Sequence, residues 1–115
     1  MLKGYIEAYY GRLFSQDERA KVINHMGKLN MDFYLYGPKE DIYHRVQWGK
    51  AYPVKEQKIL RHLISQCKKN NIRPIFAISP GLQSSKSSSN SKKNLIAKIK
   101  QAQKIGFKDF AIFFD

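Results

Sequence analysis

The stretch Tyr34-Leu35-Tyr36-Gly37-Pro38-Lys39-Glu40-Asp41-Ile42-Tyr43-His44-Arg45 joins a short apolar run to a cluster of polar side chains. The apolar residues are typical of a buried strand, and Gly37-Pro38 predicts that the strand ends in a loop. In α/β proteins, polar side chains at the carboxyl end of a strand commonly bind ligands. No spacing in this stretch is diagnostic, so taken alone it is more simply interpreted as a solvated loop.

Strand and helix patterns alternate along the whole chain. Ser15-Gln16-Asp17-Glu18 is a capping box, which predicts that a helix begins at Ser15. A second helix is predicted from Pro53 to about Lys69, and a third from about Lys92 to a C-cap at Gly106. Strands are predicted at 6–10, 31–36, 73–79 and 110–114. This alternation favours a parallel sheet with right-handed crossovers.

Apolar residues at helical spacing predict which face of each helix is buried. The predicted inward residues are Val22, Ile23, Met26 and Leu29 in the first helix, Ile59, Leu60, Leu63, Ile64 and Cys67 in the second, and Leu95, Ile96, Ile99 and Ala102 in the third. The serine-rich segment 84–91 is predicted to be a loop. The apolar run 110–114 is typical of a parallel strand that is covered on both faces.

The predicted domain is incomplete. No helix follows the fourth strand, and a four-stranded parallel sheet by itself has two unpaired edges. We therefore expect residues 1–115 to form one incomplete domain that self-associates through its open sheet edges or is partly unfolded.

The net charge of +12 comes entirely from the second half of the chain. Twelve Lys or Arg and no Asp or Glu lie between residues 57 and 108, and the remainder carries nine of each sign. Such asymmetry is compatible with a polyanion partner. It is equally compatible with lysine-rich solvated helix faces, or with acidic residues elsewhere in a longer protein. We do not expect a nucleic acid partner, because no nucleic-acid-binding motif is present and the aromatic residues lie mainly on strands.

Composition excludes several other classes of protein. A hydrophobic content of 43% predicts a folded chain, and its apolar runs are too short to span a membrane. The single cysteine, Cys67, excludes an internal disulfide or a cysteine-based zinc site, and we expect neither a metal nor a cofactor. The start of the chain has no secretory signal pattern, which favours the cytoplasm if Met1 is the true start.

Four strand-end motifs, taken together, resemble the N-terminal half of the catalytic domain of glycoside hydrolase family 84, the β-N-acetylglucosaminidases. This family includes protein O-GlcNAc hydrolases and hyaluronidase-like enzymes. The resemblance covers the whole chain, and four motifs in order are more specific than any one of them. The motifs are Gly4-Tyr5-Ile6-Glu7-Ala8-Tyr9-Tyr10-Gly11, the stretch from Tyr34 to Arg45 with Trp48, Phe76-Ala77-Ile78-Ser79-Pro80-Gly81-Leu82, and Asp109-Phe110-Ala111-Ile112-Phe113-Phe114-Asp115.

The resemblance implies a partial TIM (β/α)8 barrel of the α/β class, with about the first four strands and three helices. It also implies hydrolysis of N-acetylglucosamine linkages in a glycan or glycoprotein, with retention of configuration and with the sugar's own 2-acetamido oxygen as nucleophile. By resemblance, Asp115 is the carboxylate that orients the acetamido group. Lys39 resembles the lysine that binds sugar hydroxyls, and Tyr10 and the backbone around Ala8 match the pocket wall.

The chain departs from the family pattern at several positions. The family usually has Gly where this chain has Ala8, and Asp where it has Glu40, while Gln83 stands where an aspartate is common. The family's general acid would follow Asp115 and is absent from the 115 residues, so we expect the isolated chain to be inactive. The alternative is a half-barrel that dimerises into a closed barrel, as a structural or sugar-binding module. His44, Arg45 and Trp48 are expected to pack the loop rather than to act in catalysis.

Overall fold

The computed structural model describes residues 2–8, 13–38, 41, 43–44, 49–79 and 88–113. The predicted alternation of strands and helices is confirmed. In chain order the elements are β1 (Gly4–Glu7), α1 (Gln16–Lys28), β2 (Phe33–Tyr36), α2 (Val54–Lys69), β3 (Arg73–Ile78), α3 (Ser88–Ile105) and β4 (Asp109–Ile112).

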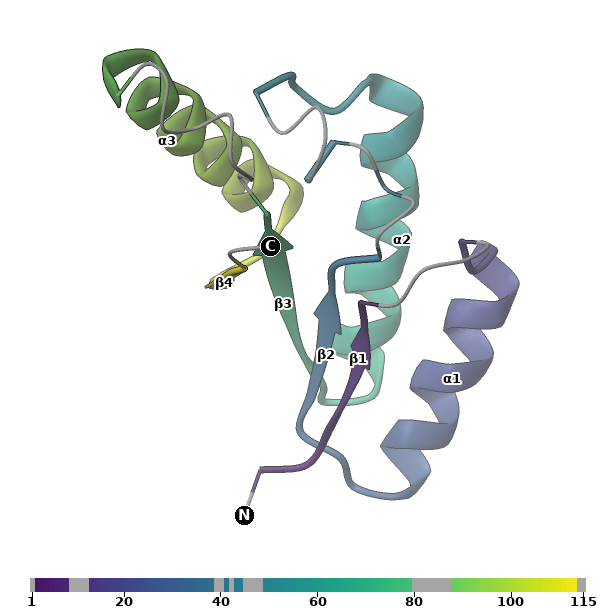
Figure 1. Ribbon diagram of the computed structural model, residues 1–115. Helices are drawn as coiled ribbons and strands as arrows, with labels where there is room; N and C mark the ends of the chain where they lie inside the picture. Colours follow the sequence, from purple (N-terminus) through teal and green to yellow (C-terminus); the bar gives the residue numbers. More distant parts are fainter. Residues whose placement is uncertain are drawn as a thin grey trace.

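The four strands form one parallel sheet in the order β1-β2-β3-β4 (Figure 1). Tyr36 of β2 is level with Glu7 of β1 and with Phe76 of β3, which is level with Phe110 of β4. Because all pairs are parallel, the carboxyl ends of the strands lie along one edge of the sheet. The segments that follow the strands therefore start from that edge.

The helices cover one face of the sheet and bury the core against it. Ile23 and Met26 of α1, Leu60 and Leu63 of α2, and Phe76 of β3 are all at most 3% exposed. The same cluster includes Cys67, which is buried as predicted, and Ala102 of α3. No helix in the described parts of the chain has both the length and the apolar character needed to span a membrane.

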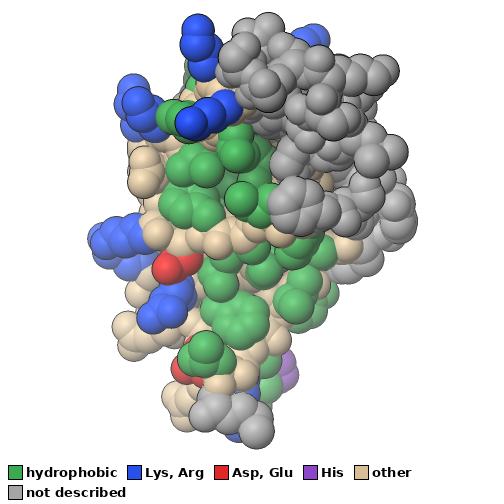
Figure 2. All heavy atoms as spheres, turned by 60° about the vertical axis from the view of Figure 1, so that its left-hand side comes forward, with side chains coloured by type: hydrophobic (Ala, Val, Ile, Leu, Met, Phe, Trp, Pro, Cys, Tyr) green, Lys and Arg blue, Asp and Glu red, His purple; other side chains and the backbone are tan. Residues whose placement is uncertain are grey.

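The opposite face of the sheet is apolar and has no helix over it among the described residues. A Cβ built on Gly37 would lie 2.8 Å from the Ala77 Cβ and 3.5 Å from the Phe113 ring, so these three residues share this face. Ile6 of β1 is 55% exposed. Figure 2 shows hydrophobic side chains gathered on one face of the molecule, with Lys and Arg at its border. On the face that carries the helices, Ile112 of β4 is 45% exposed, as expected for a fourth strand whose outer face has no helix of its own among the described residues.

Element boundaries differ from the sequence prediction by a few residues. The strand predicted at 6–10 runs from Gly4 to Glu7, and α3 begins at Ser88, inside the segment predicted to be a loop. A serine in a helix costs about 0.5 kcal/mol relative to alanine. This cost is small, so serines do not prevent the first turn of α3 from forming. The capping box at Ser15 is confirmed: the Ser15 Oγ accepts from the Glu18 N–H at 3.1 Å, and the Glu18 carboxylate accepts from the Ser15 N–H at 2.8 Å.

Two of the predicted inward residues point to solvent. Leu29 is 57% exposed because it is the C-cap residue of α1, where the chain turns away through Asn30 with a φ of 54°. Ile96 is 44% exposed, and the inward position on α3 is occupied instead by Lys98, which is 2% exposed. The buried stripe of α3 is therefore partly polar.

Candidate active site

The carboxyl edge of the sheet is connected across all four strands by backbone hydrogen bonds. The Gly37 N–H donates to the Glu7 carbonyl at 2.8 Å, the Ser79 N–H to the His44 carbonyl at 2.7 Å, and the Phe113 N–H to the Ile78 carbonyl at 2.9 Å. Ala8 follows β1 at this edge and is half-buried. Tyr10, Lys39 and Asp115 lie outside the described residues, as do Arg45 and Trp48, so their predicted roles stay predictions.

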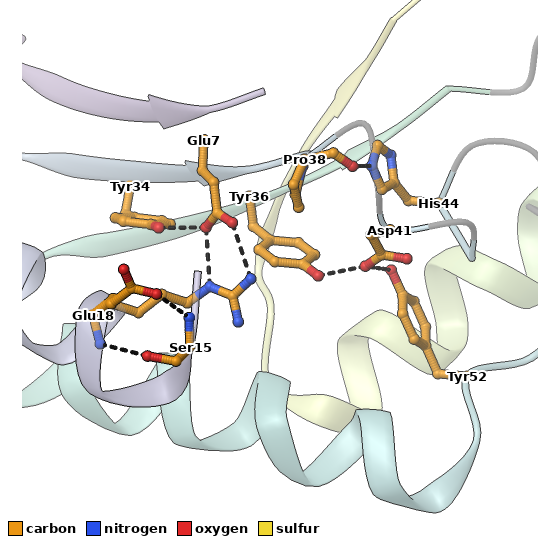
Figure 3. Close-up of polar contacts among 10 residues, drawn as sticks. Glu7, Ser15, Glu18, Tyr34, Tyr36, Pro38, Asp41, His44 and Tyr52 are labelled. Carbon is orange, nitrogen blue, oxygen red and sulfur yellow. Dashed lines mark hydrogen bonds and ion pairs between the residues drawn. The ribbon is translucent and has the colours of Figure 1, made fainter. Parts of the chain in front are cut away.

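The loop that follows β2 is held by the carboxylate of Asp41 (Figure 3). Its Oδ2 accepts hydrogen bonds from the hydroxyls of Tyr36 and Tyr52, the latter at 2.9 Å, and its Oδ1 accepts from the Tyr43 N–H at 2.8 Å. Asp41 is 6% exposed, so these three donors replace water around the charge. This buried carboxylate fixes the chain just after Lys39 and Glu40.

Burial and the charge of Asp41 both raise the pKa of its two tyrosine partners. The pKa values of Tyr36 and Tyr52 lie well above the ordinary value because desolvation disfavours the phenolate, and the neighbouring carboxylate disfavours it further. Both hydroxyls therefore stay protonated at neutral pH. They act as hydrogen-bond donors and not as bases.

A second buried carboxylate, Glu7, lies at the end of β1. Arg19 of α1 donates to it twice, from Nε at 3.0 Å and from Nη2 at 2.9 Å, and the Tyr34 hydroxyl also donates to it. The Arg19 guanidinium lies 5.1 Å from the centre of the Tyr36 ring, which connects this group to the Asp41 group. Figure 3 shows the two carboxylates on either side of Tyr36. The sequence shows Glu7 as a charged residue within a predicted strand, but no pattern in it identifies Arg19 as the partner.

His44 packs inside the loop, which confirms its predicted structural role. It is fully buried, and its Nε2 is within hydrogen-bond distance of the Pro38 carbonyl. Its own carbonyl accepts the bond from Ser79 at the end of β3. The loop after β2 is thereby joined to the next strand of the sheet.

The side chain of Ser79 is 1% exposed, and its Oγ has no hydrogen-bond partner among the described residues. An unsatisfied buried hydroxyl costs about 1–3 kcal/mol, so Ser79→Ala is expected to raise the free energy of unfolding by roughly 1 kcal/mol. Urea denaturation of the complete protein, followed by circular dichroism, measures this change. Ser65→Ala, at an exposed position of α2, is the control and should stay within about 0.5 kcal/mol. A loss of stability in Ser79→Ala would contradict the prediction.

No group of His, Cys, Asp or Glu side chains within the described ranges is arranged to hold a metal ion. The two buried carboxylates, Glu7 and Asp41, are each surrounded by hydrogen-bond donors, so both are held in structural contacts.

Comparison with known proteins gives consistent matches over the whole chain. A sequence model described as β-N-acetylglucosaminidase matches residues 3–115. Protein O-GlcNAcase of Rattus norvegicus is 36% identical over 114 residues, which are 99% of this chain and 12% of the relative, and protein O-GlcNAcase of Mus musculus matches to the same extent. A solved structure of a mutant Thermobaculum terrenum O-GlcNAc hydrolase has a TM-score of 0.92 at 35% identity, covering 99% of this chain and 25% of that chain.

Proposed function

Since this chain belongs to the β-N-acetylglucosaminidase family, we propose that it supplies the first part of the active site of an enzyme that removes terminal N-acetylglucosamine. The fold is a partial (β/α)8 barrel of glycoside hydrolase family 84, as the sequence motifs predicted. The chain spans only 12% of the curated relatives that it matches. The activity, the substrate and the partners of the whole protein are therefore part of the proposal.

The observation that carries this proposal is the common carboxyl edge of the four strands. In TIM-barrel enzymes, the active site is built from the segments that follow the strands at this edge. Ala8 follows β1, Lys39 follows β2 and Asp115 follows β4, so the residues that match the family motifs all belong to such segments. The substrate is a glycan or a glycoprotein that carries N-acetylglucosamine.

In the proposed reaction, the 2-acetamido oxygen of the sugar attacks the anomeric carbon and forms an oxazoline, while the glycosidic bond breaks. The carboxylate of Asp115 accepts the acetamido N–H, which orients the carbonyl oxygen and offsets the positive charge that develops on the ring. Lys39 donates to sugar hydroxyls, and Tyr10 and the backbone at Ala8 form the pocket wall. A further carboxylate protonates the departing glycosidic oxygen as general acid, and then, as general base, deprotonates the water that attacks the anomeric carbon and opens the oxazoline. We expect the 115-residue chain by itself not to turn over substrate.

The test is to express the complete product of the gene and measure its hydrolysis of para-nitrophenyl N-acetyl-β-glucosaminide. Proton NMR of the first product should show the β-anomer, because the reaction retains configuration. Absence of hydrolysis, or an α-anomer as first product, would contradict the proposal. Binding to heparin without hydrolysis would instead support a polyanion-binding module.

Lys39→Ala should lower kcat/KM of that enzyme by roughly 10- to 100-fold, since a hydrogen bond from a charged group contributes about 1.5–3 kcal/mol. Steady-state kinetics with the same substrate measures the change. Lys58→Ala, at an exposed position on α2, is the matched control and should leave kcat/KM within about twofold. An equal loss in both variants would assign the effect to overall charge and not to a sugar contact.

A further inference from the structure

Lys98 is a buried lysine on the inner face of α3. It is 2% exposed, and its Nζ donates a hydrogen bond to the Lys50 carbonyl. The same Nζ lies 4.4 Å from the centre of the Tyr52 ring and 6.0 Å from that of Tyr43. Other lysines of this helix, such as Lys100 and Lys104, are exposed. Burial lowers the pKa of Lys98 to about 8, so its placement costs free energy that a solvated lysine would not cost.

Gln101 follows Lys98 on the same face of α3 and binds the same segment. Its Oε1 accepts from the Tyr52 N–H at 2.7 Å, and its Nε2 donates to the Tyr52 carbonyl at 3.2 Å. The side-chain amide thus satisfies both backbone polar groups of one residue. Together, Lys98 and Gln101 hold residues 50–52, which lie between the loop after β2 and the start of α2.

Tyr52 connects residues 50–52 to the loop that follows β2. Its hydroxyl donates to the Asp41 carboxylate at 2.9 Å, and the Asp41 N–H donates to the Pro38 carbonyl at 3.1 Å. Pro38 and Asp41 flank Lys39 and Glu40 in the sequence. A short series of direct contacts therefore leads from α3 to both neighbours of the Lys39–Glu40 pair.

We propose that Lys98 and Gln101 are positioning residues for sugar binding, which act by holding Tyr52 and Asp41 and thereby the segment that carries Lys39. This inference rests on the proposed function, because it gives Lys39 a sugar to bind. Neither residue touches the substrate. Their contribution is to hold Tyr52 and Asp41 in place before a sugar binds, so that less conformational freedom is lost on binding.

The first test is Lys98→Met, which keeps most of the side-chain volume and removes the amine. In the complete enzyme we expect KM for para-nitrophenyl N-acetyl-β-glucosaminide to rise about tenfold and kcat to change less than about threefold, as for a lost binding interaction. Lys104→Met, at an exposed position on the same helix, is the control and should leave both constants unchanged. If Lys98→Met does not fold, Gln101→Leu removes only the amide contacts and should give the same rise in KM.

A double-mutant cycle with Lys39→Ala separates positioning from general destabilisation. If Lys98 acts through Lys39, adding Lys98→Met to Lys39→Ala should raise KM by less than about twofold, because the group being positioned is already gone. If the two substitutions instead raise KM by independent factors that multiply in the double variant, the inference is overturned and the proposed function is unaffected.

Hydrogen–deuterium exchange by mass spectrometry gives a readout that does not depend on activity. Peptides covering 37–44 should exchange faster in Lys98→Met, whereas peptides from α1 should not change, and Lys104→Met should resemble the wild type. Unchanged exchange at 37–44 would overturn the inference. If the wild type hydrolyses no glucosaminide, the proposed function fails and the sugar-binding role fails with it, whatever the exchange shows.

Discussion

Replacing Arg19 with methionine is expected to lower the free energy of unfolding by about 3–5 kcal/mol, because it leaves the Glu7 carboxylate buried without its cation. The side chains of Arg19 and Glu7 are 4% and 1% exposed, and two hydrogen bonds join them. Burial opposes the charge on Arg19, but the hydrogen bonds and charge of Glu7 outweigh it and raise the pKa of the guanidinium. A small domain is stable by only about 5–15 kcal/mol, so this single change removes a large part of the total.

Urea denaturation of the complete protein, followed by circular dichroism, measures this loss. The matched variant is the double substitution Glu7→Gln with Arg19→Met, which removes both charges and leaves an amide to accept from the Tyr34 hydroxyl. It should be more stable than Arg19→Met alone, because neutral groups cost less to bury than an unpaired charge. Lys21→Met, at an exposed position of α1, should change stability by less than about 0.5 kcal/mol. A loss below about 1 kcal/mol in Arg19→Met would show that the pair is not the main support of β1 on α1.

The order of elements was predictable because each is encoded locally. The capping box at Ser15 and the apolar spacing of Leu60, Leu63 and Cys67 need no distant partner to be recognised. The exact ends were less predictable, as α3 shows by beginning at Ser88 within a serine-rich segment. A serine is compatible with a loop, a cap or a first helical turn, so composition alone does not decide between them.

The buried polar groups were not predictable to the same degree. Arg19 follows two acidic residues in a first helical turn, where a basic residue is ordinarily solvated, and its partner Glu7 is far away in the sequence. Only the packing of α1 on β1 brings the two together. A signal was nevertheless present, since a charged residue inside an apolar strand needs a partner when the strand is buried.

Lys98 is a second charged residue at a position that the sequence pattern predicts to be buried. It lies between Leu95 and Ala102 at helical spacing, on the stripe that the sequence assigned to the core. The sequence alone groups Lys98 with the other basic residues of the second half of the chain, whereas in the structure its Nζ donates to the Lys50 carbonyl. Long side chains bury their methylene groups readily, so helical spacing alone does not separate a solvated lysine from a buried one.

Asp115→Asn is expected to lower kcat of the complete enzyme by about 100- to 1,000-fold, the loss typical of removing one group that stabilises transition-state charge. The amide is close to the carboxylate in size, but it carries no negative charge to offset the oxazoline ring. The substrate is also bound through contacts to its other groups, which Asp115→Asn does not change. KM should therefore change much less than kcat. Steady-state kinetics with para-nitrophenyl N-acetyl-β-glucosaminide measures both constants.

The control for this variant is Asp109→Asn, at the other end of β4. Asp109 is paired with Arg73 at 3.6 Å, and both side chains are largely exposed, at 43% and 63%. Exposed pairs contribute little, so this change should leave kcat within about twofold. The para-nitrophenyl glucoside, which has a hydroxyl in place of the acetamido group, should be cleaved poorly by the wild type and should not respond further to Asp115→Asn. An equal loss of kcat on both sugars would contradict an action of Asp115 through the acetamido group, because such an action requires that group to be present.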